Sequence, residues 1–202
     1  MERLKAVAFT CSLKPSPDES STDILTKQLL DELRVQEVDT KIFRVVDYDI
    51  LPGVQADMGE GDAWPSLRSE ILQADIFILA TPTWVGHMSS EAQRVIERLD
   101  AELSFADEAG RLKTYNKVAC TVVVGNEDGA HKISADVFQS LNDLGFTIPA
   151  AGVTYWNGEA MGSVDYKDLS ETPEKVTLTT RRLAINAAHV ARVLKANNYP
   201  SE

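Results

Sequence analysis

The stretch from Asp75 to Leu99 constrains the fold of this chain more than any other part of the sequence. It opens with an apolar run, Ile76 to Ala80, which is too short for a stable helix and rich enough in branched residues for a buried strand. A loop with a proline and a glycine follows, and Ser89 then offers a hydroxyl that can cap the start of a helix. Strand, loop and helix form the half-unit of a parallel α/β sheet, whose ligands bind beyond the carboxyl ends of the strands.

The same alternation runs through the rest of the chain. Strands are predicted at 4–11, 41–46, 76–80, 117–124 and within 146–156, and helices at 23–33, 65–72, 89–99, 133–144 and 174–196. About five strands that each return through a helix predict a parallel sheet covered on both faces. Length and strand count favour an α/β fold of the flavodoxin-like type, a three-layer sandwich with a doubly wound five-stranded parallel sheet, over the six-stranded dinucleotide-binding fold.

We expect residues 1–202 to form a single domain, because no internal repeat, low-complexity tract or long interior linker divides them. Residues 47–64 contain three glycines and many acids, which predicts a long loop rather than a core element.

Charge and composition disfavour several classes of binding partner. The formal net charge of −11 disfavours nucleic acid and anionic membrane surfaces, and no apolar run approaches the length of a membrane span. The apolar part of the N-terminus is too short for a signal peptide. The two cysteines, Cys11 and Cys120, lie in apolar runs and have no metal-ligand spacing, so we expect buried thiols in a reducing cytoplasm.

Three loops follow predicted strands and are expected to meet at one edge of the sheet. The first, from Ser12 to Thr22, is rich in hydroxyls and leads into a helix N-terminus, which suits a phosphate; its alternative is an ordinary capped polar loop. This loop has no glycine, so it is not a nucleotide P-loop, and Pro17 stands where a cysteine phosphatase would need its arginine, so Cys11 is interpreted as core filler.

The second loop, 81–90, offers Trp84 as a face on which a flat ring can stack, although a surface or subunit anchor is an alternative. The third, 125–131, pairs two glycines with acids and an amide, and alone it is better explained as an acidic turn. A phosphate clamp, a stacking wall and a polar edge together describe a mononucleotide with a planar ring, such as FMN.

Four motifs are spread over nearly the whole chain: C-S-L-K-P-S-P-x-x-S-S-T, A-T-P-T-W-V-G-H-M-S-S-E-A-Q-R-V-I-E-R-L, V-V-G-N-E-D-G-A-H and the late Y-W-N-G-E-A-M-G. In these motifs the chain resembles the NADPH-dependent FMN reductase branch of the flavodoxin-like superfamily. Lys14 stands where many relatives have an arginine. The resemblance implies that FMN is bound by Ser12, Lys14, Ser20, Ser21 and Thr22 at the phosphate, by Pro82, Thr83, Trp84, Val85 and Gly86 at the ring, and by Gly125, Asn126, Asp128 and Gly129 at its pyrimidine side. Tyr155 and Trp156 are weaker candidates for contact with the cofactor or with a partner subunit.

The resemblance also implies an activity. NADPH or NADH would deliver a hydride to FMN, which would pass electrons to a flavin, a quinone or a similar small-molecule acceptor, in a homodimer or homotetramer. No side chain needs to act as an acid, base or nucleophile, and no metal is expected. The alternative is a flavodoxin-type electron carrier without steady turnover of its own. A phosphoacceptor receiver domain is set aside, because Ala80 and Cys11 stand where it would need aspartates.

Overall fold

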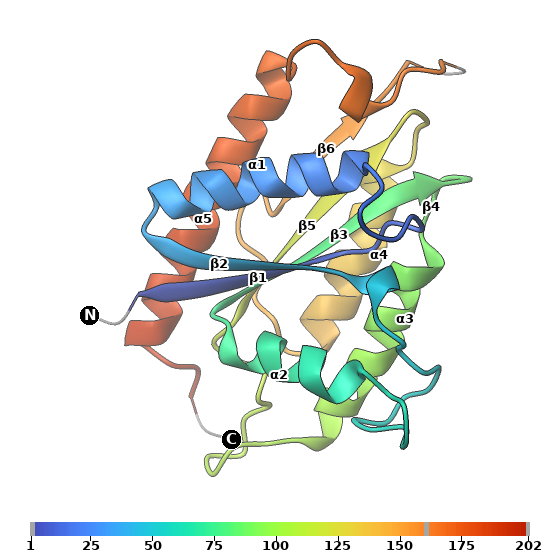
Figure 1. The fold of residues 1–202 in the computed structure, drawn as a ribbon. Coiled ribbons are helices and arrows are strands. Elements are labelled where there is room, and N and C mark those ends of the chain that lie inside the picture. Colours follow the sequence, from blue (N-terminus) through green and yellow to red (C-terminus); the bar gives the residue numbers. More distant parts are fainter. Residues whose placement is uncertain (1–2, 160–161, 201–202) are drawn as a thin grey trace.

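A computed structural model describes residues 3–159 and 162–200 of the chain (Figure 1). Five parallel strands form a sheet in the order β2-β1-β3-β5-β6, which confirms the flavodoxin-like prediction. A sixth, two-residue strand, β4, pairs antiparallel with the end of β3 and was not expected. The strands are β1 (Leu4–Thr10), β2 (Val38–Arg44), β3 (Ile76–Trp84), β4 (His87–Met88), β5 (Val118–Gly125) and β6 (Val153–Asn157).

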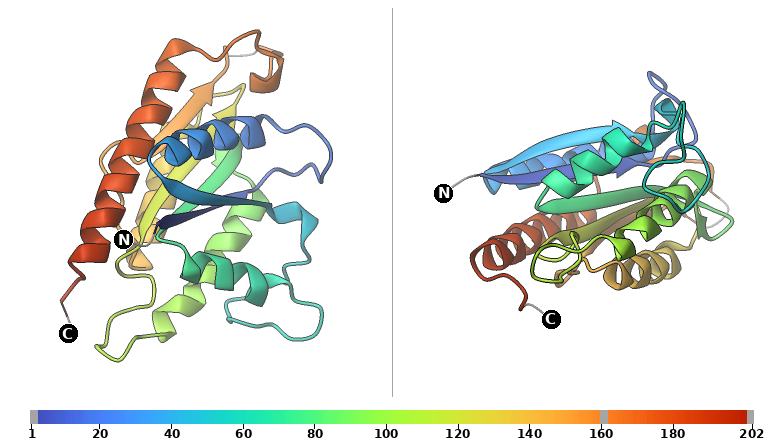
Figure 2. Two further views of the ribbon diagram at one scale, coloured as in Figure 1. Left: turned by 60° about the vertical axis from the view of Figure 1, so that its left-hand side comes forward. Right: turned by 90° about the horizontal axis from the view of Figure 1, so that it is seen from below.

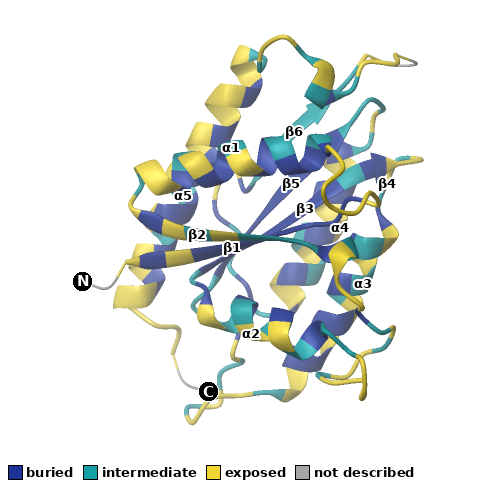
Figure 3. Cartoon of the chain, viewed as in Figure 1, coloured by how far each residue is buried: buried dark blue, intermediate teal, exposed yellow. Residues whose placement is uncertain are grey.

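Helices cover both faces of the sheet (Figure 2). The helices are α1 (Ser21–Val35), α2 (Trp64–Gln73), α3 (Ser90–Leu99), α4 (Ala130–Asp143) and α5 (Glu174–Ala196), with 3-10 turns η1 (Val45–Asp47), η2 (Asp100–Ser104) and η3 (Tyr166–Asp168). One core lies between α1, α5 and one face of the sheet, and the other lies between α2, α3, α4 and the opposite face. The central strands β1, β3 and β5 are accordingly the most buried elements (Figure 3).

The third strand is longer than its apolar run suggests. It continues through Trp84, so Pro82 and Trp84 belong to a strand and not to a loop. Pro82 is tolerated because β1 has already ended at Thr10, opposite Ala80, and the side of β3 that faced β1 needs no further N–H donors. The second strand also differs from its prediction, since it begins at Val38 and ends at Arg44.

The prediction of a long loop is confirmed for residues 48–63, which form no helix or strand, but both ends of the segment reach into the core. The side chains of Ile50 and Trp64 are buried in the core beneath α2 and α3. The carboxylate of Asp62 is buried as well, and Arg98 of α3 holds it with hydrogen bonds of 2.7 and 3.1 Å. The segment is therefore an excursion that is anchored in the core at its two ends.

Within the described ranges, no helix is both long and apolar enough to cross a membrane.

Candidate functional site

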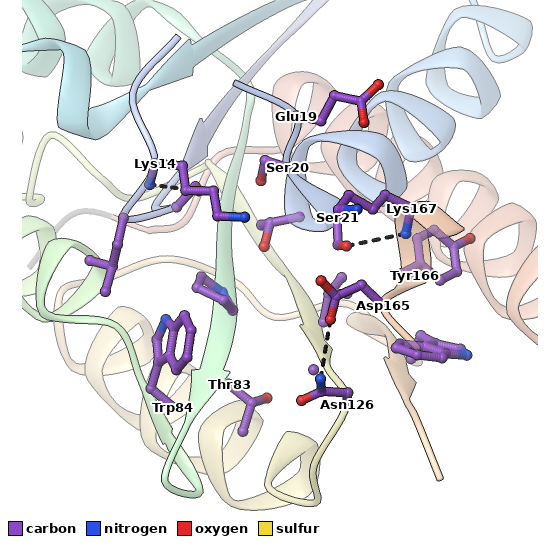
Figure 4. A pocket seen from close by; sticks show the side chains of 17 residues that line it. Lys14, Glu19, Ser20, Ser21, Thr83, Trp84, Asn126, Asp165, Tyr166 and Lys167 are labelled. Carbon is purple, nitrogen blue, oxygen red and sulfur yellow. Dashed lines mark hydrogen bonds between the residues drawn. The ribbon is translucent and has the colours of Figure 1, made fainter. Parts of the chain in front are cut away.

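An open cavity lies where the parallel strands end, between the loops that follow β1, β3 and β5 (Figure 4). Its volume is about 700 Å³, part of it open to solvent. Most of the predicted site residues line it: Ser12, Lys14, Ser20, Ser21, Thr22, Pro82, Thr83, Trp84, Gly125 and Asn126. Val85, Gly86, Asp128 and Gly129 do not line it.

One end of the cavity is the N-terminus of α1. The hydroxyl of Ser20 caps this helix by accepting a hydrogen bond from the Asp23 N–H at 3.3 Å. No acceptor among the described residues takes the backbone N–H groups of Ser21 and Thr22. Two free donors at the positive end of a helix dipole form a place where an anion can bind.

Two lysines flank this end. Lys14 comes from the loop after β1, and its backbone N–H is held by the Ser12 hydroxyl at 3.1 Å. Lys167 comes from η3, and its backbone N–H donates to the Ser21 hydroxyl oxygen at 3.2 Å, which leaves the Ser21 O–H able to donate into the cavity. A hydrogen bond to Asp168 raises the pKa of Lys167, so this ammonium stays charged at neutral pH.

The opposite end is built on the tip of β3. Trp84 is 52% exposed, and together with Pro82 it borders the cavity (Figure 4). Val85 and Gly86 form the two-residue turn between β3 and β4, with φ values of +51° and +70°. The carboxylate of Glu127 accepts hydrogen bonds from both of their N–H groups, at 2.8 and 3.2 Å, and so ties the turn to the loop after β5.

Thr83 lines the cavity between these two ends. A Cβ added to Gly125 would lie 2.6 Å from the Thr83 Cβ, and one added to Gly129 would lie 2.9 Å from its Cγ2, so only glycine fits at these two positions. The Thr83 side chain is 5% exposed, and its hydroxyl oxygen has no hydrogen-bond partner among the described residues. A buried hydroxyl of this kind, in a ligand-sized cavity, is suited to a polar atom of a ligand.

Sequence reasoning missed one wall of the cavity, the segment of Asp165, Tyr166 and Lys167. The Asn126 Nδ2 donates to the Asp165 carboxylate at 3.1 Å, which joins this segment to the loop after β5. The signal that could have found it is its position after β6, because a parallel last strand ends at the same edge as the others. Leu13, Glu19, Val124 and Trp156 complete the lining.

Other predicted candidates have different surroundings. Trp156 lines the cavity and packs against Tyr166, with ring centroids 5.5 Å apart, whereas the Tyr155 hydroxyl contacts His131 at 3.0 Å outside it. Residues 160 and 161, which belong to the last motif, lie outside the described residues. Burial raises the pKa of the Cys11 thiol, and the nearby Glu91 carboxylate raises it further, so Cys11 is no nucleophile at neutral pH. The described residues hold no group of three or more His, Cys, Asp or Glu that could bind a metal.

The strand order and the position of the cavity define a flavodoxin-like protein. The chain belongs to the NADPH-dependent FMN reductase family, whose sequence model matches residues 4–160. Membership implies FMN and a nicotinamide nucleotide as cofactors and a flavin-dependent oxidoreductase type of enzyme.

Two curated relatives match nearly the whole chain. The chain is 29% identical over 209 residues to the 8-demethyl-8-aminoriboflavin-5'-phosphate synthase of Streptomyces davaonensis. This match covers 98% of this chain and 81% of that protein. The chain is 36% identical over 200 residues to a Mycobacterium bovis protein named divalent metal cation transporter MntH, which covers 96% of this chain. The chain spans only 29% of the length of that second relative.

Two solved structures share the fold of this chain. The structure of RosB with bound 8-demethyl-8-formylriboflavin-5'-phosphate superposes with a TM-score of 0.88 at 29% identity, over 97% of this chain and 82% of that one. The NADH:FMN oxidoreductase EMOB has a TM-score of 0.65 at 15% identity, over 98% and 94% of the two chains, which is a likeness of fold.

Proposed function

We propose that this chain is an FMN-dependent NAD(P)H oxidoreductase that reduces a small-molecule acceptor such as a flavin or a quinone. The observation that carries the proposal is the order of groups along the cavity (Figure 4). Free N–H groups, hydroxyls and lysines lie at one end, and an exposed indole above an unpartnered buried hydroxyl lies at the other. This order matches a molecule with a phosphate at one end and a flat polar-edged ring at the other.

The phosphate end suits FMN on charge as well as on hydrogen bonding. An acidic protein repels a phosphate at long range, so it needs local donors to bind one. The N–H groups of Ser21 and Thr22 would donate to the phosphate oxygens, together with the hydroxyls of Ser12 and Ser20. Lys14 would supply a positive charge beside the phosphate.

The ring end suits an isoalloxazine. Trp84 and Pro82 would cover one face of the ring, and the Thr83 hydroxyl would meet a polar atom at its edge. The close packing of Gly125 against Thr83 brings backbone within reach of the ring, where a side chain would block it. Val85, Gly86, Asp128 and Gly129 would act behind this wall, by shaping the β3–β4 turn and the loop that supports it.

The chain's part in the reaction is binding and orientation. When bound, FMN would supply the redox chemistry that links a nicotinamide hydride to the acceptor. The chain holds the ring between Trp84 and Thr83 and keeps water from the side that faces the sheet. We assign no acid, base or nucleophile. We also propose a homodimer or homotetramer, which analytical ultracentrifugation tests directly.

The match to the Streptomyces davaonensis synthase and the RosB structure favour a second candidate function. The match to the Streptomyces davaonensis synthase extends past residue 160, where the family match ends, and so includes the Asp165–Lys167 wall. The RosB structure holds a flavin phosphate altered at its ring. In this second function FMN is a substrate whose ring is changed, and not a cofactor that returns unchanged.

One experiment separates the two functions. The purified protein is incubated with FMN, NADPH and a quinone in air, and the flavin is recovered and analysed by mass spectrometry. The proposal predicts consumption of NADPH and quinone with FMN recovered at its original mass. A flavin of altered mass would favour the second function, and a protein that neither binds FMN nor consumes NADPH would refute both.

A further inference from the structure

The end of β2 lies beside the predicted phosphate loop because of the sheet register. Arg44 is the last residue of β2 and is opposite Thr10, the last residue of β1. The loop 12–20 starts just beyond that point, so the Arg44 side chain lies against it although Arg44 is 30 positions after Lys14 in the sequence. The side chain is only 9% exposed, which is unusual for an arginine at a strand end.

The Arg44 guanidinium uses its donors on the loop and on the helix that follows it. It donates to the carbonyl oxygens of Lys14 at 3.3 Å and Asp18 at 2.8 Å. It also donates twice to one carboxylate oxygen of Asp23, at 2.5 and 3.1 Å, in the first turn of α1. One cation therefore joins two points of the loop to the helix N-terminus.

A second tie comes from η1, which follows β2 directly. The Asp47 carboxylate accepts hydrogen bonds from the Ser16 backbone N–H at 2.8 Å and from its hydroxyl at 2.6 Å. These bonds to Ser16 lower the pKa of Asp47 although burial by itself raises it, so the carboxylate stays ionised at neutral pH. The loop is thus held from the β2 end at three of its residues, Lys14, Ser16 and Asp18.

We propose that Arg44 and Asp47 are positioning residues of the phosphate end, which hold the loop 12–20 in its binding conformation and so give the protein its preference for a phosphorylated flavin over riboflavin. This inference rests on the proposed function. Neither residue lines the cavity, so both act through the loop.

The physical reason is the entropy of the loop. Residues 13–19 are exposed and make no contact with the apolar core that could order them. A loop that is ordered only when its ligand arrives lowers the affinity for that ligand by the entropic cost of fixing the loop.

The contacts of Arg44 also fix the direction of one peptide and balance a charge. The carbonyl of Asp18 points to Arg44, so the N–H of Glu19 in the same trans peptide points to the opposite side. Arg44 also balances the Asp23 carboxylate, which would otherwise repel a phosphate at the start of α1.

The test compares the affinities for FMN and riboflavin, measured by fluorescence titration under one set of conditions. Arg44→Met should weaken FMN binding about tenfold and riboflavin binding less than about twofold, because only the phosphate meets this loop. Asp47→Asn should act in the same direction by about threefold. Lys41→Met is the matched control, since Lys41 is on the same strand and pairs with Glu70 at the exposed surface; it should change neither affinity.

A double variant separates loop positioning from loss of charge. In Arg44→Met combined with Asp23→Asn, no unpaired carboxylate is left, and we expect FMN binding to stay weak. Recovery of wild-type FMN affinity in this double variant would overturn the positioning role. An equal loss of FMN and riboflavin affinity, or no loss of either, in Arg44→Met would overturn it as well. If the unmodified protein binds neither flavin, the proposed function itself fails, and this inference fails with it.

Discussion

The side-chain amide of Asn126 donates a hydrogen bond of 3.1 Å to the carboxylate of Asp165 across the middle of the cavity. Asn126 follows β5, whereas Asp165 lies 39 residues later, beyond the part of the chain that the family model matches. The pair lies between Ser21 at the start of α1 and Trp84 at the end of β3 (Figure 4). In the proposed complex this is where the hydroxyl-bearing ribityl chain of FMN would lie.

Asp165→Asn tests this placement. A carboxylate is an acceptor for ribityl hydroxyls, and its replacement by an amide should weaken both FMN and riboflavin about tenfold. Lumiflavin, which has the ring without the ribityl chain, should bind unchanged. Fluorescence titration with the three flavins measures the effect, and Asp31→Asn, at an exposed residue of α1 that is paired with Arg34 and does not line the cavity, is the control. An equal loss for lumiflavin would show that Asp165 acts on the ring.

Thr83→Val should separate ligand binding from stability. The valine keeps the shape and removes a buried hydroxyl that has no partner, so the flavin-free protein should keep its stability or gain up to about 1 kcal/mol. FMN affinity should fall by about threefold to tenfold, because the hydroxyl no longer meets the ring. Thermal unfolding without FMN measures the stability of the variant, and the shift on adding FMN measures its FMN affinity. A less stable variant with unchanged FMN affinity would mean that the hydroxyl supports the fold only.

Asp62 makes the stability depend on pH. Burial by itself raises the pKa of this carboxyl, but the hydrogen bonds from Arg98 and from the backbone of Met58, Trp64 and Leu51 outweigh it and lower the pKa well below its usual value. The stability that comes from the ionised carboxylate is present above the unfolded-state pKa of about 4 and is lost as the pH falls through the lower folded-state pKa.

Asp62→Asn should therefore lower the free energy of unfolding by about 3 kcal/mol at pH 7, because Arg98 is left as a buried unpaired charge. The difference from wild type should shrink as the pH falls below about 4. Urea unfolding at a series of pH values measures this difference. Asp39→Asn, at an exposed residue paired with Arg3, should change little at any pH. A difference that does not vary with pH would contradict the account.

Elements with a strong local pattern could be predicted from the sequence. The last helix was predicted at 174–196 and is found there. The prediction succeeded because its apolar residues recur at helical spacing over all 23 residues of the helix. The cap at Ser89 was also predicted, since a side-chain cap depends on residues three positions apart. The strand β2 was misplaced, because an edge strand is only half buried and Asp39 and Lys41 make its start look polar.

Contacts between distant parts of the chain could not be predicted in the same way. Arg44 holds the loop 12–20, and Asp165 faces Asn126, only because parallel strands bring their carboxyl ends to one edge. The rule that ligands bind at this edge was applied to the loops after three strands and not to the ends of β2 and β6. Applied to all five parallel strands, it would have selected both residues as candidates.

The central claim, that this chain holds FMN and reduces it with NAD(P)H, is tested most directly by the visible absorption spectrum of the protein loaded with FMN, recorded without oxygen before and after NADPH is added. The account predicts that flavin absorption moves with the protein through gel filtration, bleaches with NADPH or NADH, and returns when a quinone or air is admitted. Bound flavin that neither nucleotide bleaches would favour an electron carrier. A protein that takes up no FMN would contradict the account.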